Sequence, residues 1–170
     1  MTAYIALLRA VNVGGTGKLP MTELKALCEA AEFAKVETYI ASGNVVFESG
    51  LTEAEVVAAL DRKLNAYAGK PVGVLVRTAA EMTAGLKANP FTDAAPNYTV
   101  AIFLDTPPAA DALNGIVAPD GEQVRLGKRE IYVYYPNGQG RSKLKIPAAK
   151  AGTARNINTV ARLAEMAGAL

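Results

Sequence analysis

Residues 1–77 alternate between strand-like and helix-like patterns in an order that few folds can accommodate. The segment Tyr4–Val11 is apolar except for Arg9, which is typical of a buried strand. After it come the amphipathic helical pattern MTELKALCEAAEF, two β-rich runs, a second helical pattern and the strand-like run PVGVLVR. The order β-α-β-β-α-β is that of the split βαβ, or ferredoxin-like, arrangement, in which an antiparallel four-stranded sheet carries two helices on one face.

Turn and cap residues indicate where these elements begin and end. Ser42-Gly43-Asn44 lies between the β-rich runs Val36–Ala41 and Val45–Glu48, and glycine and asparagine tolerate the positive φ of a hairpin turn. Thr52 and Glu55 have the spacing of a capping box at the start of the second helix. The sequence therefore predicts a hairpin followed directly by a well-capped helix.

Residues 98–170 repeat this order incompletely. After a connecting helix closed by Asn89-Pro90 come a strand (NYTVAIFLD), a short helix (PPAADALNGIV), a hairpin around Gly127-Lys128 and a terminal helix capped by Thr153. A fourth strand is missing, and KLKIP is the candidate for it. We predict an α+β protein of two duplicated ferredoxin-like halves with mainly antiparallel sheets. These halves are residues 1–77 and 98–170, joined by a connecting helix and loop over residues 78–97.

Composition restricts the available chemistry. The 170 residues include no histidine and one cysteine, Cys28, which lies in a helical pattern. Without histidine, a protein-bound zinc and a serine–histidine mechanism are disfavoured, and a lone cysteine of this kind is typical of a core residue in a reducing compartment. No apolar run approaches the ~20 residues of a membrane span, and the N-terminus lacks the marks of a signal peptide. We expect a cytoplasmic protein with no metal, cofactor or membrane partner.

Positive charge concentrates in the second half. Residues 125–162 hold nine basic residues against the single acidic residue Glu130, a net charge of +8. The basic residues are Arg125, Lys128, Arg129, Arg141, Lys143, Lys145, Lys150, Arg155 and Arg162. If they share a face they attract anions, and if they are dispersed they form a solvated rim. The partner that this charge predicts is a phosphate-bearing ligand or a nucleic acid, and the oligomeric state stays open.

The loop NVGGTGKLP (residues 12–20) resembles phosphate-binding loops only in part. Gly17-Lys18 fit the P-loop pattern, but Asn12 stands at its first glycine position and Leu19 at its hydroxyl position. The dinucleotide-binding pattern also fails, because Pro20 replaces its last glycine. The glycine amides, the lysine and the N-terminus of the following helix still favour an anion. The alternative is a flexible turn with a solvated lysine.

Polar residues cluster at the start of the terminal helix pattern. In TARNINTVAR, the i, i+3, i+4, i+7 spacing of one helix face holds Arg155, Asn158, Thr159 and Arg162. Asparagine and threonine are poor helix formers, so their presence on one face favours a functional role. The structural alternative is that Asn156 or Asn158 caps a neighbouring loop and Arg155 makes a structural ion pair. Both interpretations stay open.

Other patterns carry less weight. Tyr132 and Tyr134 share one face of a strand, as base-stacking aromatics do in RNA-binding sheets, but the Gly-Phe/Tyr signature of those sheets is absent. Asp105 ends an apolar strand, as the magnesium-assisting aspartate of nucleotidases does, but a P-loop enzyme needs a parallel sheet and the first half indicates an antiparallel one. No carboxylate pair stands out, so no catalytic residue is assigned and enzymatic activity is left open.

Several segments taken together resemble the bacterial domain of unknown function family 1697. They are spread over nearly the whole chain, from Tyr4 to Val160, and are, in order, YIALLRAVNVGGTGKLPMTELKAL, TYIASGNVVFES, NPF, REIYVYYPNGQGRSKL and GTARNINTV. The resemblance implies a duplicated ferredoxin-like protein of bacterial origin and brings no established activity. Ile157 stands where the family pattern has tryptophan, and its place on a buried stripe indicates packing. The distinctive polar residues of the family correspond to Arg9, Asn12, Gly14, Gly15, Lys18, Ser42, Gly43, Asn44, Arg155, Asn156, Asn158 and Thr159.

These observations lead to one hypothesis and two alternatives. The hypothesis is a site for a phosphate-bearing small molecule or nucleic acid, formed by the 12–18 loop, the 42–44 hairpin tip and the 155–159 helix start. Its candidate ligand-binding residues are Arg9, Asn12, Gly14, Gly15, Lys18, Ser42, Asn44, Arg155, Asn156, Asn158 and Thr159. The first alternative is a non-catalytic structural or interaction protein whose polar motifs lock the two halves together. The second is a magnesium-dependent nucleotide enzyme.

Overall fold

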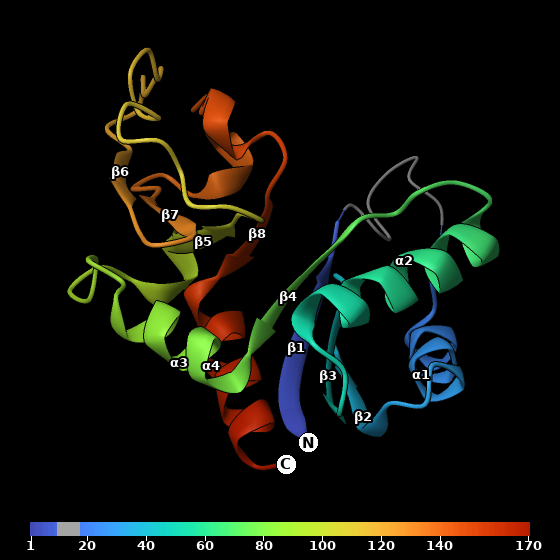
Figure 1. Ribbon diagram of the computed structural model, residues 1–170. Coiled ribbons are helices and arrows are strands. Elements are labelled where there is room, and N and C mark those ends of the chain that lie inside the picture. Colours follow the sequence, from blue (N-terminus) through green and yellow to red (C-terminus); the bar gives the residue numbers. More distant parts are fainter. Residues whose placement is uncertain (10–17) are drawn as a thin grey trace. The chain divides into compact units, whose positions relative to one another are not determined.

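A computed structural model describes residues 1–9 and 18–170 of the chain (Figure 1). The chain divides into two compact units. Unit 1 is Met1–Met82 together with Leu163–Leu170, and unit 2 is Thr83–Arg162. Each unit contains one four-stranded antiparallel sheet, so the predicted α+β class with antiparallel sheets is confirmed. Within the described residues, no helix has both the length and the apolar character needed to cross a membrane.

Unit 1 contains the element order β-α-β-β-α-β that the sequence predicts. Its strands are β1 (Thr2–Leu8), β2 (Ala34–Tyr39), β3 (Asn44–Ser49) and β4 (Val74–Thr78). They lie in the order β2-β3-β1-β4, and all neighbouring strands are antiparallel. The helices are α1 (Met21–Ala30) and α2 (Glu53–Ala68). The predicted hairpin is present, and it joins β2 to β3.

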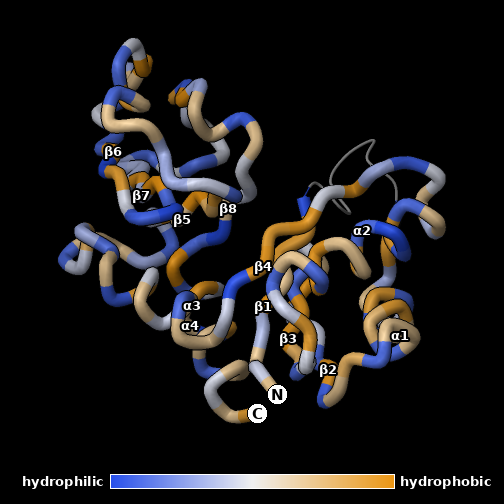
Figure 2. Tube along the Cα trace, in the orientation of Figure 1, coloured by the Kyte–Doolittle hydropathy of each residue, from blue (hydrophilic) through white to orange (hydrophobic). Residues whose placement is uncertain are grey.

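The core of unit 1 lies between its sheet and the two helices. Alternate residues of β1 and β3 face α1 and α2, because successive side chains of a strand point to opposite faces. The cluster includes Tyr4, Ala6, Leu8, Leu24, Cys28, Phe33, Val45, Phe47, Val56, Leu60 and Leu64. The apolar character of β3 and β4 is visible along the chain in Figure 2. Burial raises the pKa of the Cys28 thiol to about 12, so this residue stays protonated and serves packing, as predicted.

Two capping boxes start consecutive helices. In the predicted one, the Glu55 backbone N–H donates to Thr52 Oγ1 (3.3 Å) and the Thr52 N–H donates to Glu55 Oε1 (3.1 Å). A second box at Thr78 and Glu81, with distances of 2.9 and 3.1 Å, begins α3 (Ala79–Lys87). The same Thr-x-x-Glu spacing marks both in the sequence. The predicted connecting helix is therefore confirmed and is fixed locally at its start.

Unit 2 repeats the strand order of unit 1. Its strands are β5 (Thr99–Phe103), β6 (Gln123–Leu126), β7 (Glu130–Tyr134) and β8 (Thr153–Asn156). They lie in the order β6-β7-β5-β8, again antiparallel throughout. The predicted hairpin is closed by the Gly127 N–H, which donates to the Glu130 carbonyl at 2.7 Å. Short 3-10 helices are η1 (Pro96–Tyr98), η2 (Gln139–Arg141) and η3 (Pro147–Ala149), and α4 (Ile157–Gly168) ends the chain.

The two faces of the unit 2 sheet differ in chemistry. One face is apolar and packs against residues of the long connections. The sheet contributes Val100, Ile102, Val124, Ile131 and Val133 to this cluster, and Leu113, Ile116, Leu144 and Ile146 pack against them. Since successive side chains of a strand point to opposite faces, the residues between these sheet positions share the other face. Arg125, Tyr132, Ala101 and Arg155 form one cross-strand row of that second face.

The short helix predicted over PPAADALNGIV does not form. Three overlapping turns replace it, closed by hydrogen bonds from Ala112 to Ala109, from Asn114 to Asp111 and from Ile116 to Leu113. Only about two helical turns would fit between Pro108 and Gly115, and so short a helix is marginal without tertiary support. The turns instead let Leu113 and Ile116 pack against the apolar face of the sheet.

The terminal helix begins later than its predicted Thr153 cap. Residues 153–156 are strand β8, which pairs with β5 through Val100 opposite Asn156 and Phe103 opposite Thr153. This is the fourth strand that the sequence analysis lacked. The other candidate, KLKIP, contributes only an isolated bridge between Lys145 and Val117. Pairing with a distant strand overrides weak local preference, and sheet formation commonly depends on such context.

Candidate functional site

Most of the predicted ligand-binding loop lies outside the described residues. Asn12, Gly14 and Gly15 lie outside the described residues. Of the residues that flank them, Lys18 is exposed and Arg9 is half-buried. The Arg9 backbone N–H donates to the Gly73 carbonyl at 3.1 Å, and a Cβ at position 73 would lie 3.1 Å from Arg9 Cδ. Gly73 also has a φ of 85°, so both its backbone conformation and the close approach of Arg9 favour glycine at this position.

The predicted hairpin tip lies beside the end of β1. The Leu8 N–H donates to the Gly43 carbonyl at 2.9 Å, and Leu7 pairs with Asn44. Asn44 is fully buried, and its Nδ2 donates to the Tyr39 carbonyl and to Ser42 Oγ, both at 2.9 Å. Unit 1 thus brings the tip next to the strand that leads into the loop. The Asn44 amide helps to hold the turn itself.

Arg155 is a buried cation in β8. Only 7% of the residue is exposed, and its Nη1 donates to Thr153 Oγ1 (2.7 Å) and to the Ala154 carbonyl (2.9 Å). Burial lowers the pKa of Arg155 to about 10, which leaves the guanidinium cationic at neutral pH. These bonds place Nη1 beside the first residues of the strand and anchor the side chain.

The helix face predicted for this motif is wrong, because α4 begins at Ile157 and Arg155 precedes it. Asn156 is the N-cap, and its Oδ1 accepts the Thr159 N–H at 2.9 Å. Asn158 is exposed, whereas Thr159 is buried. Ile157 is also buried, in agreement with the packing role predicted for it. The segment therefore divides into a buried arginine, a helix cap and an exposed amide.

The two tyrosines of β7 have different environments. Tyr132 is 1% exposed, and its hydroxyl donates to the Gly85 carbonyl at 2.6 Å. Burial and the nearby Glu130 carboxylate raise the pKa of Tyr132. This ring is a core residue and offers no surface for stacking. Tyr134 is only half-buried and lies at the far end of the strand from Glu130.

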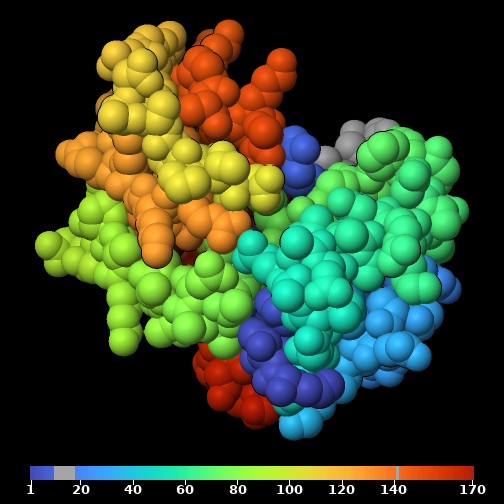
Figure 3. Space-filling model, viewed as in Figure 1, coloured from blue at the N-terminus to red at the C-terminus, as the bar shows by residue number. Residues whose placement is uncertain are grey.

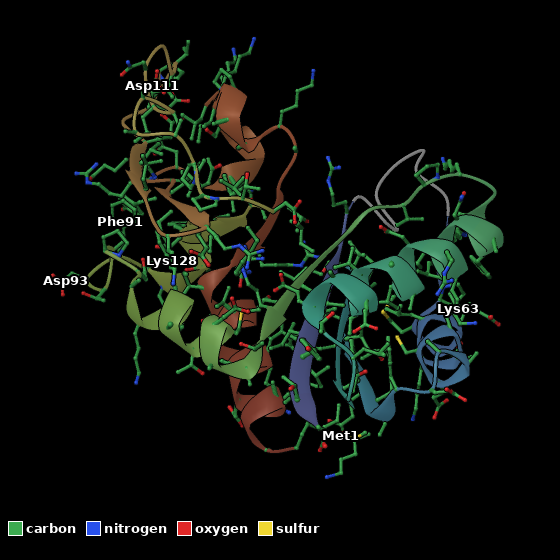
Figure 4. All side chains as sticks on the ribbon, viewed as in Figure 1. Met1, Lys63, Phe91, Asp93, Asp111 and Lys128 are labelled. Atoms are coloured by element: carbon green, nitrogen blue, oxygen red, sulfur yellow. The ribbon has the colours of Figure 1, made fainter. Side chains whose placement is uncertain are left out.

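A pocket of about 290 Å³ opens beside Tyr134 in unit 2. Its lining residues are Pro90, Phe91, Asp93, Ala94, Gln123 and Tyr134. Gln123 and Tyr134 face each other across β6 and β7. The other wall is the turn after α3, where Figure 4 labels Phe91 and Asp93. In the space-filling view this segment, coloured yellow-green, lies at the surface of the molecule (Figure 3).

Local hydrogen bonds hold Phe91 in this position. The Phe91 N–H donates to Asn89 Oδ1 at 3.0 Å, and the Ala94 N–H donates to the Phe91 carbonyl at 3.1 Å. The ring centroids of Phe91 and Tyr134 are 6.2 Å apart, with planes tilted by 38°. Arg125 Cζ lies 5.9 Å from the Phe91 centroid, within the range of a cation–π contact. An aromatic pair and a guanidinium are thus assembled at one edge of the sheet.

The carboxylates of the described residues are dispersed. Residues 1–9 and 18–170 contain no group of three or more His, Cys, Asp or Glu side chains that could hold a metal ion. Asp105, the aspartate considered for magnesium, is exposed, and its backbone carbonyl accepts from Arg129 Nε (3.2 Å) and Nη2 (2.9 Å). In these two hydrogen bonds Asp105 therefore accepts through its main-chain carbonyl and not through its carboxylate.

Comparison with known proteins identifies the family and no activity. The model of a family described as protein of unknown function, DUF1697, matches residues 1–132. The chain belongs to this family. A solved structure, that of the conserved bacterial protein SP0830 from Streptococcus pneumoniae, is similar to this DUF1697 chain over 98% of each chain, with a TM-score of 0.80 and 25% identity. Among curated proteins, none matches the DUF1697 chain.

Four lining residues of the pocket escaped the sequence analysis. Phe91 appeared there only as part of the NPF segment, and Asp93, Ala94 and Gln123 were not considered as site residues. The available signal was the Asn89-Pro90 turn, since an Asx turn commonly fixes the residue that follows it. Nothing local indicates that Phe91 meets Tyr134, because the two residues approach only when the turn packs beside the sheet.

Proposed function

We propose that the protein binds a phosphate-bearing or other anionic ligand, either a small molecule or a nucleic acid. The observation that carries this proposal is the unequal charge of the two units. Unit 2 has ten Lys and Arg against six Asp and Glu, a net charge of +4, whereas unit 1 has eight against ten, a net charge of −2. Arg125, Lys128, Lys143, Lys145 and Lys150 are exposed on unit 2. A surface with such an excess attracts anions.

The polar family motifs supply further proposed contacts. Lys18 is exposed in unit 1, and Asn158 is exposed at the start of α4 in unit 2. Arg9, Ser42, Asn44, Arg155, Asn156 and Thr159 remain proposed contributors, as do Asn12, Gly14 and Gly15 outside the described residues. The N-terminus of α4 carries partial positive charge that adds to an attraction for anions.

A matched pair of charge reversals tests the proposal. The Lys143→Glu, Lys145→Glu variant changes exposed residues of unit 2, and the Lys25→Glu, Lys70→Glu variant changes exposed residues of unit 1. Both variants have the same net charge. We expect the unit 2 variant to weaken binding of tripolyphosphate or a single-stranded RNA by about tenfold or more at about 50 mM salt, and the control to bind almost as the wild type does. Calorimetric titration measures both affinities.

Two results would reject this proposal. One is that the wild type binds neither anion at low salt. The other is that the two variants lose affinity equally, because the effect would then follow net charge and not the charge of unit 2.

A structural role for the polar motifs is the second candidate. It is favoured by the bonds that Asn44, Arg155 and Asn156 make within their own segments. Such bonds hold a turn, a strand and a helix start, which any stable fold requires. This role needs no ligand.

Asn156 and Asn158 distinguish these two candidates. Asn156→Ala is expected to lower the free energy of unfolding by about 1 kcal/mol, because the N-cap is lost. Asn158→Ala removes an exposed amide and is expected to leave stability nearly unchanged. Urea denaturation followed by circular dichroism measures both. If the motif also contacts an anion, Asn158→Ala weakens tripolyphosphate binding. An unchanged affinity in that variant would assign the motif to structure alone.

We infer further that both sheets are versions of one ferredoxin-like plait. The support is the shared order, in which β2-β3-β1-β4 corresponds to β6-β7-β5-β8 with all neighbours antiparallel. The crossovers differ: turns replace the first helix in unit 2, and η2 and η3 stand between β7 and β8. A duplication in which unit 2 lost its crossover helices accounts for both the shared strand order and the different crossovers.

A further inference from the structure

We propose that the pocket beside Tyr134 binds the base of a nucleotide, with Arg125 next to its phosphate. The proposal rests on the proposed function, since it takes a nucleotide as the anionic ligand, and it adds a site that lies entirely within unit 2. Pro90, Phe91, Asp93, Ala94, Gln123 and Tyr134 line this site. Pro90, Phe91 and Tyr134 lie in segments of the family resemblance, and none of the six lining residues is among the distinctive polar residues of the family.

The aromatic pair supplies the stacking surface. Phe91 and Tyr134 both line the pocket, with ring centroids 6.2 Å apart and planes tilted by 38°. Every nucleobase has a π-face, so such rings accept bases of any sequence. The Asn89 side chain and the Phe91–Ala94 turn already hold the backbone from which the Phe91 ring projects, beside the ring of Tyr134. A pre-positioned ring loses little freedom when a base stacks on it, which favours binding.

Arg125 supplies the charge. It is exposed on the edge strand β6, and its Cζ lies 5.9 Å from the Phe91 centroid. Its Nη1 donates to the Val124 carbonyl at 2.9 Å, which fixes the guanidinium beside the pocket. A guanidinium has five N–H donors in a planar fork, and this geometry suits a phosphate. The rings of Phe91 and Tyr134 therefore serve the base of a nucleotide, and Arg125, beside Phe91, serves its phosphate.

Size and polarity agree with one base. Ligand pockets generally begin at about 300 Å³, so a space of about 290 Å³ suits a single ring system better than a dinucleotide. Asp93 offers only hydrogen-bond acceptors, and Gln123 offers both donors and acceptors. These two side chains match the N–H and carbonyl groups on the edge of a base such as guanine.

Binding of guanosine, guanosine monophosphate and inorganic phosphate to the full-length chain tests the proposal. We expect the nucleoside and the nucleotide to shift the backbone amide signals of residues 91–94, 123 and 134 in ¹H–¹⁵N NMR spectra, and inorganic phosphate alone to leave them in place. Phe91→Leu keeps an apolar side chain without a π-face and is expected to weaken nucleotide binding about tenfold. Tyr98→Leu, which changes an exposed ring of η1 outside the pocket, is the matched control and should bind as the wild type does.

The outcomes separate this site from the general anion binding proposed above. A single-stranded guanine-rich hexanucleotide can bind where the mononucleotide does not. If Phe91→Leu then weakens binding of the hexanucleotide about tenfold, the base pocket is supported and its ligand is an RNA strand. If no base-bearing ligand shifts these amides, or if Phe91→Leu binds as the wild type does, the pocket proposal is overturned. Tripolyphosphate binding that depends on Lys143 and Lys145 would then still support the proposed function. Circular dichroism of each variant shows that the fold is intact.

Discussion

Replacement of Phe47 with alanine is expected to lower the free energy of unfolding by about 4 kcal/mol. Phe47 lies on β3 with no exposed surface and stacks on Phe33, with ring centroids 4.3 Å apart and an angle of 6° between planes. Tyr4 contacts it from β1, with a centroid distance of 6.0 Å. The truncation removes buried apolar surface and both ring contacts. It leaves a cavity that the sheet, held on both sides by ladder bonds, cannot close.

Urea denaturation followed by circular dichroism checks this prediction. The matched control is Tyr67→Ala on α2, because Tyr67 is 45% exposed and lies outside the core cluster. We expect the control to change stability by less than about 1 kcal/mol. A comparably small loss in Phe47→Ala would mean that the Tyr4, Phe33 and Phe47 rings do not form the tightly packed centre of unit 1.

Replacement of Gly152 with alanine is expected to lower the free energy of unfolding by about 3 kcal/mol. A Cβ at this position would lie 2.6 Å from the Phe103 carbonyl oxygen, 2.9 Å from Ile102 Cγ2 and 3.0 Å from Leu104 Cδ2. The nearest of these atoms belongs to the backbone of β5, so no side-chain rotation relieves the clash. Gly152 directly precedes β8, and the added methyl group must therefore push this strand away from β5.

Gly140→Ala is the control for this variant, because a Cβ at Gly140 would meet nothing within 4 Å. We expect Gly140→Ala to leave stability within about 0.5 kcal/mol of the wild type. Thermal unfolding of both proteins provides the comparison, and amide exchange of residues 153–156 reports on β8 directly. Equal stability of the two variants would contradict the close packing of Gly152 against β5.

Where structure depends on local signals, the sequence predicted it well. The hairpin at residues 42–44 and the capping box of α2 are present as expected, because positive φ at Gly43 and the Thr-x-x-Glu spacing act within a few residues. The same holds for the burial of Cys28 on α1. Apolar periodicity and cap chemistry are short-range properties, and a single sequence displays them fully.

The candidate site was harder to predict, because its geometry depends on the strand assignment of residues 153–156. The helical spacing of Arg155, Asn158 and Thr159 suggested one shared face. In the structure, Arg155 belongs to β8 and is buried, whereas Asn158 lies on α4 and is exposed. Asn156 caps the helix in place of Thr153. A shift of three residues in the N-cap, from Thr153 to Asn156, therefore separates side chains that the pattern had placed together.

By itself, the sequence determined the element order of unit 1, its hairpin, the capping box of α2 and the excess of basic residues in the second half. The tertiary structure decided that residues 153–156 are a strand, that Arg155 and Tyr132 are buried, and that Phe91 and Tyr134 form one pocket. The physical reason is the range of the interactions. Periodicity and caps act between neighbours in the chain, whereas strand pairing and pocket formation depend on segments that meet only after folding.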